Sequence, residues 1–307
     1  MTKHIEEKLL KIPVLNILVR AAKKIPIPGL QGMSFYDILE MYITGIINGA
    51  VTTRASGIAF SFLMAIFPFL VFVLNLIPYV PIEGFQEDFL YLMRQWMPPT
   101  TSTEFFDSII NYITNHNYGG ILSFYIILSI LLMTNGINAI FGGFEYSYHV
   151  KVTRNVIRQY LIALGISILL VFFMLLTVAV AFYFEVGIEK LKDSGWLQDD
   201  VLWIVIGQKV FFAVMVFISV STLFYFGTKE GKHHKFISEG SIMTTLLFIL
   251  LIYLFGIYVV RFSKYNELYG SIGTLLVFML FIWLNSIILL LGFELNASLH
   301  RIKKRFK

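Results

Sequence analysis

The sequence predicts an all-α, polytopic membrane protein with a bundle of six transmembrane helices, and three observations lead to this fold class. Hydrophobic residues make up 57% of the 307 residues, charged residues only 14%, and the mean hydropathy is +0.77, far from the values of soluble domains. Runs of about 10 residues, typical of a membrane β-barrel, are absent from the pattern. Six apolar runs instead reach the roughly 20 residues that cross a bilayer, at residues 55–80, 118–144, 160–186, 201–227, 237–260 and 270–295.

The first 54 residues are predicted to form a basic tail followed by an amphipathic interfacial helix. Apolar residues recur at helical spacing over residues 35–50, and polar residues such as Asp37 and Glu40 lie opposite them. This pattern is typical of a helix lying along a membrane surface. The earlier stretch at residues 5–24 fits either the same surface packing or a solvated tail.

Two further segments complete the predicted organisation. Residues 81–117 form an acidic external loop, in which Thr101 and Glu104 have the spacing of a capping box, so we expect short helices there. Residues 55–299 form the membrane domain, and residues 300–307 form a second basic tail. We find no inverted repeat between the first and last three spans, which favours a single bundle.

Lys and Arg are concentrated in alternate connections, which predicts the orientation. They are abundant in both tails and in the second and fourth connections between spans, and rare in the others. Because cytoplasmic loops carry the excess of positive charge, both termini are expected in the cytoplasm. Juxtamembrane basic residues also favour anionic phospholipid, among other membrane lipids, as the partner, and we expect no binding of nucleic acid.

The sequence lacks the residues and motifs that several classes of chemistry require. The chain has no cysteine, its six histidines are scattered, and it contains neither an H-E-x-x-H motif nor a phosphate-binding G-x-x-x-x-G-K-[ST] loop. Phosphodiester hydrolysis would need clustered carboxylates or histidines to bind metal or transfer protons. We therefore expect no catalytic residue, no metal site and no cofactor, and hence no enzyme.

The polar ends of spans one, two, five and six are predicted to meet at the cytoplasmic side. Glu294 is a carboxylate inside a membrane-length helix, a costly position that usually has a function. Arg54 is placed to neutralise either Glu294 or Glu145, because buried charges are retained when paired. This set forms either a substrate pocket or a structural ion pair with helix contacts, and its members are Arg54, Asn135, Asn138, Glu294 and Asn296.

Secondary candidates lie elsewhere in the spans. Lys209, beside Gln208, either extends toward the membrane surface or serves as counter-ion to a carboxylate or phosphate, with Glu185 as a partner. Asn285 in the sixth span acts either as a ligand or, more commonly for a lone amide, as a helix–helix contact. Glu145 belongs to the same secondary group.

Small residues and a proline mark helix packing and a hinge. Gly57, Ser61 and Ala65 recur at every fourth position of the first span, which permits close helix approach and leaves room for a homo-oligomer. Pro68 frees a backbone carbonyl in the middle of that span and is a candidate bending point. Gly270 and Gly273 have the packing role at the start of the sixth span.

Two segments resemble the YihY/BrkB family of bacterial inner-membrane proteins. They are RASGIAFSFLMAIFPFLVFVLNLIP in the first span and YGSIGTLLVFMLFIWLNSIILLLGFELNA in the last, and the likeness extends over residues 39–299. The segment TNGINAIFGGFEYSYHVKVTR fits in part but lacks a tryptophan often seen there. The resemblance implies an inner-membrane location. The family that it resembles was formerly named a ribonuclease, but the scattered histidines and carboxylates of this chain do not support ribonuclease activity.

Two functional hypotheses follow from these residues. In the first, the bundle is an envelope transporter or lipid-handling permease that moves an amphipathic or anionic substrate through a polar cavity. In the second, the protein is a non-transporting membrane scaffold or envelope-assembly protein, and the buried polar residues only join helix ends.

Overall fold

The computed structural model describes residues 34–76, 122–147, 150, 154–193, 201–229, 231, 235–261 and 271–305, and a number of side chains within these ranges, including those of residues 67–76, 181–193, 201–205 and 302–305, lie outside the description. All regular structure in these ranges is helical. The helices are α3 (Phe35–Asn48), α4 (Val51–Leu76), α7 (Leu122–Glu145), α8 (Val156–Asp193), α9 (Val201–Gly227), α10 (Glu239–Arg261) and α12 (Ser271–Arg305).

The predicted helical membrane fold is confirmed. Within the described residues, five helices are long and apolar enough to cross a bilayer, over Ile127–Glu145, Val156–Val180, Ile206–Gly227, Glu239–Val259 and Leu275–Arg301. The first predicted span corresponds to α4, whose described apolar segment is the shorter Val51–Ile66 and whose helix continues to Leu76. The predicted external loop at residues 81–117 and the tail at residues 5–24 lie outside the described residues.

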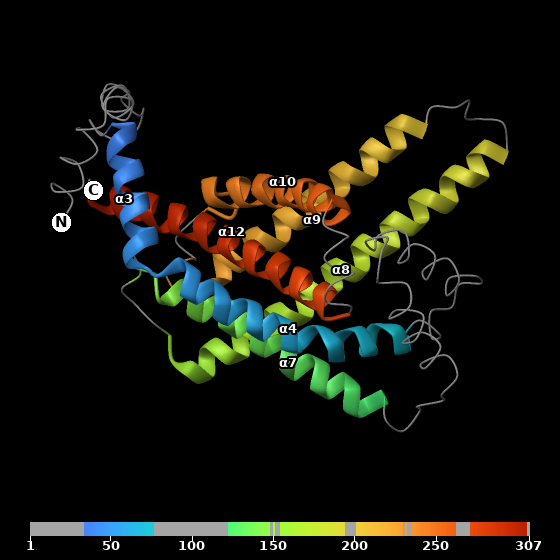
Figure 1. Cartoon of the computed structure of the whole chain (residues 1–307), viewed down its shortest axis with the longest axis horizontal. Coiled ribbons are helices and arrows are strands. Elements are labelled where there is room, and N and C mark those ends of the chain that lie inside the picture. Colours follow the sequence, from blue (N-terminus) through green and yellow to red (C-terminus); the bar gives the residue numbers. More distant parts are fainter. Residues whose placement is uncertain are drawn as a thin grey trace.

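Three helices form the centre of the bundle. α4 packs against both α7 and α12, α10 packs against α12 and α9, and α8 packs against α7 and α9. In Figure 1, α4, α7 and α12 run close together, whereas α8 and α9 extend away from them at one end. The core between the central helices contains large apolar side chains, among them Ile58, Phe141 and Leu290, which are at most 2% exposed. The centre of the fold therefore joins segments far apart in the sequence.

Two helices are longer than a bilayer requires. α8 has 38 residues and α12 has 35, and a helix rises about 1.5 Å per residue, so both exceed even the roughly 40–45 Å of a bilayer with its headgroups. α12 continues without interruption into the segment predicted as a basic tail, as far as Arg305. The polar residues after Glu294 therefore lie on the same continuous helix as the membrane-spanning part.

The helix predicted at the membrane surface is α3, and it crosses the bundle. In Figure 1, α3 runs steeply across one end of the long helices, and it contacts α12. The chain turns from α3 into α4 at Gly49 and Ala50, and Ala50 has a φ of 46°. Non-glycine residues seldom adopt this left-handed conformation outside turns. We refer to the end of the bundle that α3 crosses as the α3 end.

Candidate functional site

A buried ion pair at the α3 end joins α4 to α12. Arg54 Nη2 donates to Glu294 Oε1 at 2.6 Å, and Ser147 Oγ donates to Glu294 Oε2 at 2.8 Å. The side chains of Arg54 and Glu294 are 8% and 0% exposed. Buried charges cost free energy unless they are paired and hydrogen-bonded, and here both carboxylate oxygens have donors. Of the two partners that the sequence left open for Arg54, the structure selects Glu294.

The same arginine caps the end of α7. Arg54 Nη1 donates to the backbone oxygen of Gly143 at 2.6 Å. The last four carbonyls of a helix lack intrahelical donors, and a cation there also interacts favourably with the helix dipole. Arg54 therefore holds three helices, α4, α7 and α12, through one guanidinium group.

α3 adds a tyrosine to this end of the bundle. Tyr42 Oη donates to the backbone oxygen of Leu291 in α12 at 3.2 Å. Burial raises the pKa of Tyr42 to about 12, and the negative charge of Glu294 acts in the same direction. The phenol therefore keeps its proton near neutral pH and remains a donor.

A second polar contact joins α12 to the start of α10. Asn296 Nδ2 donates to Ser238 Oγ at 2.8 Å, and the backbone N–H of Gly240 donates to Asn296 Oδ1 at 2.8 Å. Ser238 also caps α10, because its hydroxyl accepts from the N–H of Ser241 at 3.2 Å while the Ser241 hydroxyl accepts from the N–H of Ser238 at 3.1 Å. All these groups are buried, so Asn296 completes the cap from a different helix.

Two glycines bring α10 and α12 into close contact beside this cap. A Cβ atom placed on Gly292 would lie 1.8 Å from Thr244 Oγ1, and one placed on Gly240 would lie 2.2 Å from the backbone oxygen of Gly292. Neither position has room for a side chain. Small residues at such crossings let helix backbones approach, as is common in membrane bundles.

A third polar cluster lies between α7 and α8. The backbone N–H of Arg154 donates to Glu145 Oε1 at 3.1 Å. The Gln159 amide lies 3.1 Å from Asn138 Oδ1 and, with its nitrogen turned toward the carboxylate, 3.0 Å from Glu145 Oε2. Glu145 is thus held by its own neighbours rather than by Arg54.

The guanidinium group of Arg154 caps α9. It donates to the backbone oxygen of Phe226 at 2.5 Å and to that of Thr228. These carbonyls lie at the end of α9, where the helix leaves them without intrahelical donors. Arg54 and Arg154 therefore have the same role at the ends of two different helices.

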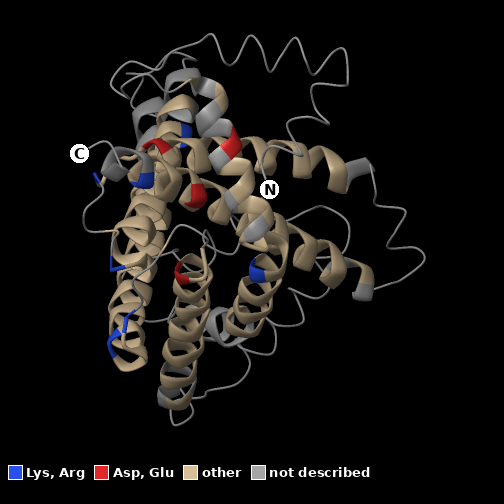
Figure 2. Cartoon of the chain, turned by 90° about the vertical axis from the view of Figure 1, so that its left-hand side faces the viewer, with Lys and Arg blue, Asp and Glu red and all other residues tan. Residues whose placement is uncertain are grey.

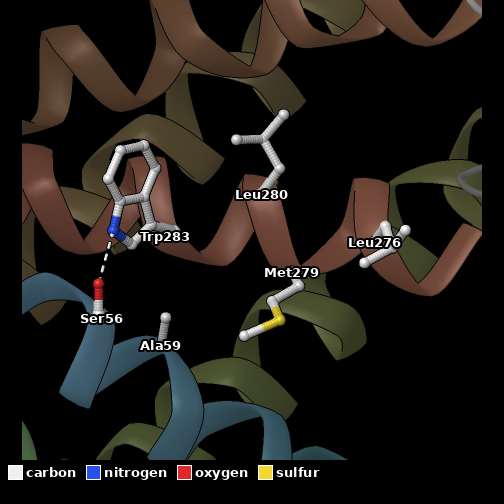
Figure 3. Close-up of a pocket in the computed structure, with 6 residues that line it drawn as sticks. All are labelled: Ser56, Ala59, Leu276, Met279, Leu280 and Trp283. Carbon is white, nitrogen blue, oxygen red and sulfur yellow. Dashed lines mark hydrogen bonds between the residues drawn. The ribbon is translucent and has the colours of Figure 1, made fainter.

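An apolar cavity of about 250 Å³ lies between α4 and α12. In Figure 3, Ser56 and Ala59 of α4 face Trp283 of α12, and Trp283 Nε1 donates to Ser56 Oγ at 3.1 Å. The full lining is Ser56, Ala59, Leu276, Met279, Leu280 and Trp283. The indole and the hydroxyl satisfy each other, so the remaining lining is hydrocarbon and sulfur.

The five residues of the predicted pocket occupy different positions in the structure. Arg54 and Glu294 form the ion pair, and Asn296 lies at the α10 cap. Asn138 belongs to the cluster with Gln159, and the side chain of Asn135 is exposed on α7. Contacts in the described residues thus divide the set among three places.

Of the secondary candidates, Glu145 belongs to the third polar cluster, and the others lie away from the three clusters. On α9, Lys209 is exposed and Gln208 is half-buried, and the side chain of Glu185 falls outside the described residues. Asn285 Nδ2 donates to the backbone oxygen of Phe281 in its own helix at 2.8 Å.

The predicted packing residues have varied surroundings. Gly57 is exposed with no atom within 4 Å of a Cβ placed on it, whereas Ser61 is half-buried and Gly273 is buried. Pro68 lies within α4, but its side chain falls outside the description, as does Gly270. Gly57 therefore offers open space on α4 rather than a contact within this chain.

Several residues of the site were not singled out as candidates from the sequence. Ser147, Ser238 and Arg154 lie just outside the ends of helices. Each forms a hydrogen bond with a residue far along the chain. A local signal existed for Ser238, because Ser and Asn before a helix favour capping. No local pattern indicates that Ala59 and Trp283 line one cavity.

Charged residues are sparse on the described helices. Figure 2, which looks toward the α3 end, shows them at few positions on helices that are otherwise uncharged. No group of three or more His, Cys, Asp and Glu residues that could hold a metal ion occurs in the described part of the chain. The chemistry visible there is hydrogen bonding, one strong ion pair and an apolar cavity.

Comparison with known proteins gives consistent relatives. The chain is 31% identical over 255 residues to YfkH of Bacillus subtilis (strain 168), named a ribonuclease-like protein, covering 82% of this chain and 91% of that protein. It is 25% identical over 249 residues to a UPF0761 membrane protein of Coxiella burnetii (strain RSA 493 / Nine Mile phase I), covering 78% and 84%. A UPF0761 membrane protein of Psychrobacter sp. (strain PRwf-1) is 24% identical over 287 residues, covering 88% of this chain and 50% of that protein. No solved structure matches.

The family model described as virulence factor BrkB matches residues 43–307. That range contains both segments on which the resemblance rested, together with all the described helices from α4 to α12. The buried pair, the α10 cap and the cavity all lie inside it. This chain is therefore a member of the virulence factor BrkB family.

Proposed function

We propose that this protein is a lipid-handling permease of the bacterial inner membrane, and that a segment of an acyl chain enters the cavity between α4 and α12. The observation that carries this proposal is the apolar lining of the cavity, to which Leu276 and Met279 contribute side chains that are 47% and 37% exposed. Exposed apolar side chains on a spanning helix face lipid, so the cavity opens toward the hydrocarbon. An acyl chain is the ligand nearest to it.

The size of the cavity limits what it accepts. Its volume of about 250 Å³ is below the roughly 300–1,000 Å³ of pockets that enclose a small-molecule ligand. It therefore holds part of one chain, and the rest of the lipid stays against the helices. A soluble ion or polar solute would find no charged partner in this lining.

The polar end of such a lipid would lie toward the α3 end. Thr52 and Thr53 are exposed one turn before Ser56 on α4, and their hydroxyl groups can bond to a headgroup. Arg54 lies beside them but is already bonded to Glu294 and Gly143. In this proposal the ion pair holds α4 and α12 at the spacing that forms the cavity.

Lipid movement in vesicles tests the proposal. Purified protein is reconstituted in vesicles that contain phosphatidylethanolamine with a fluorescent headgroup, and dithionite quenching follows its transfer between leaflets. We expect faster transfer than in protein-free vesicles. Met279→Trp, which fills the cavity, should slow it, whereas Met64→Trp on the exposed face of α4, outside the lining, should not. Transfer at the protein-free rate would contradict the proposal.

A second candidate function, a non-transporting envelope scaffold, is favoured by a different observation. Arg54, Arg154 and Asn296 each cap the end of another helix, so the buried polar residues are engaged in holding the bundle. In that case a cavity-filling change such as Met279→Trp, which leaves these capping contacts intact, does not alter function. A variant that stays folded and abundant but moves no lipid would favour the permease instead.

The ribonuclease-like name of the Bacillus subtilis relative suggests no further candidate. The match concerns a membrane protein family, and two of the described carboxylates, Glu145 and Glu294, bond to arginine, serine and backbone groups. We therefore keep the expectation that the protein is not an enzyme.

A further inference from the structure

Three cations lie together where α8 begins and α9 ends. Arg154 precedes α8 and binds the backbone oxygen of Thr228, the neighbour of Lys229, and Arg158 lies in the first turn of α8. Arg158 and Lys229 are exposed. Burial lowers the pKa of Arg154, Glu145 opposes this, and repulsion from Arg158 lowers it further, so the two arginines lie within electrostatic reach. The carboxylate near these three cations is Glu145, and it already accepts a hydrogen bond from the N–H of Arg154.

The cations lie at the edge of two spans. The apolar segment of α8 begins at Val156, and that of α9 ends at Gly227. Arg158 is therefore in the first turn of one span, and Lys229 is just beyond the end of the other. Cationic side chains in this position lie at the depth of the phosphate groups of a bilayer.

An exposed apolar stripe continues from Arg158 along α8. Leu161, Ile168 and Phe172 are 62%, 55% and 57% exposed. Gly165 lies among them, exposed, with no atom within 4 Å of a Cβ placed on it. Residues spaced by three or four positions share one face of a helix, so these side chains form one stripe with a gap at Gly165.

We propose that one anionic phospholipid binds at this place, with its phosphate between Arg158 and Lys229 and an acyl chain along α8 over Gly165. Charge complementarity favours this occupant, because exposed cations at headgroup depth attract an anion and the stripe below them is apolar. Arg154 is the positioning residue, since its bonds to Phe226 and Thr228 hold the end of α9 beside the start of α8. The site is separate from the cavity between α4 and α12 and does not depend on the proposed permease function.

The test measures lipid retention by the full-length protein. The protein is placed in phosphatidylcholine nanodiscs that contain increasing amounts of phosphatidylglycerol. Native mass spectrometry then counts the lipids that stay bound to the protein after it is released from the nanodisc. We expect the wild type to retain one phosphatidylglycerol in preference to phosphatidylcholine. Arg158→Gln/Lys229→Gln should weaken that binding roughly 30-fold, on the basis of two lost cationic contacts.

Three further variants separate the site from general effects of charge. Lys192→Gln/Lys209→Gln removes the same total charge from the halves of α8 and α9 that lie away from the site, and it should stay within about twofold of the wild type. Arg158→Lys/Lys229→Arg should retain binding, which controls for folding. Gly165→Leu should weaken binding without a change in charge, because it fills the gap in the stripe.

Other results would overturn the proposal. These are equal retention of phosphatidylcholine and phosphatidylglycerol by the wild type, undiminished retention by Arg158→Gln/Lys229→Gln, or an equal loss in the charge-matched control. None of them bears on lipid transfer through the α4–α12 cavity, so the two proposals fail separately.

Discussion

Arg54 shows how one buried side chain organises the α3 end of the bundle. Its guanidinium group bonds to Glu294 and to the backbone oxygen of Gly143, both at 2.6 Å, and its Nε atom is buried with no hydrogen-bond partner among the described residues. The arginine thus depends on the carboxylate for compensation of its charge. Loss of either member leaves the other as an isolated buried charge.

Neutralising Glu294 should therefore destabilise the protein strongly. Removing one partner of a buried pair typically costs about 3–5 kcal/mol, because the remaining charge stays desolvated. We expect Glu294→Gln to lower the free energy of unfolding by an amount in this range, measured by reversible unfolding in mixed micelles. The double variant Arg54→Gln/Glu294→Gln should lose less than the sum of the two single losses. Additive losses would mean that the two groups are not coupled.

Asn296 permits a test with a matched control two residues away. Asn296→Ala removes the acceptor for the N–H of Gly240 and the donor to Ser238. We expect a loss of about 1–3 kcal/mol, the usual cost of leaving buried polar groups unsatisfied. Ser298→Ala should be neutral or stabilising, because the Ser298 hydroxyl is buried and has no hydrogen-bond partner among the described residues. Equal losses in the two variants would contradict the cap.

At the scale of elements, the close contact between α10 and α12 depends on two glycines, which have no side chains. Gly240 and Gly292 face each other so closely that a methyl group at either position would overlap the opposite helix. Only 11% of the apolar segment of α10 is buried, and the helix packs against α12 and, to a smaller extent, against α9. The Asn296 cap and the glycine contact therefore act together on a peripheral helix.

Gly292→Ala and Gly256→Ala test this contact as a matched pair. The first places a Cβ 1.8 Å from Thr244 Oγ1, and the second places one in open space on α10. Overpacking costs about 1–3 kcal/mol, whereas Ala in place of an exposed helical Gly gains roughly 0.5–1 kcal/mol. We expect thermal unfolding midpoints to fall for Gly292→Ala and to stay or rise for Gly256→Ala. A tolerated Gly292→Ala would show that α10 is not held at this crossing.

At the scale of the whole molecule, charge asymmetry along the sequence predicts a single orientation. The connection between α9 and α10 contains the exposed residues Lys229 and Lys235, and the positive-inside rule places it in the cytoplasm. The loop at residues 81–117, which is acidic in sequence, is predicted on the opposite side. Because the chain contains no cysteine, each side can be probed with a single introduced thiol.

We expect Lys235→Cys to react with a membrane-impermeant maleimide only after spheroplasts are opened. Gln86→Cys, in the predicted external loop, should react in intact spheroplasts. The cysteine-free wild type controls for background labelling. Labelling of Lys235→Cys in intact spheroplasts would reverse the predicted orientation.

Much of the fold could be predicted because the required information is local. A bilayer demands about 20 consecutive apolar residues and internal satisfaction of every backbone group, so composition along the chain indicates where helices cross. The amphipathic period over residues 35–50 indicated α3 in the same way. The overlap of α12 with the last predicted span follows from this one-dimensional rule.

The apolar pattern along the chain predicted the fold class, the approximate positions of the spans and which few residues are polar inside them. The grouping of those residues became known from the packed helices: Arg54 with Glu294, Asn296 with the start of α10, Asn138 with Gln159, and Asn135 exposed. The apolar cavity between α4 and α12 likewise became apparent only from the packing of the helices. The physical reason is that apolar length specifies a helix but not its rotation about its own axis, and rotation sets which side chains meet across an interface.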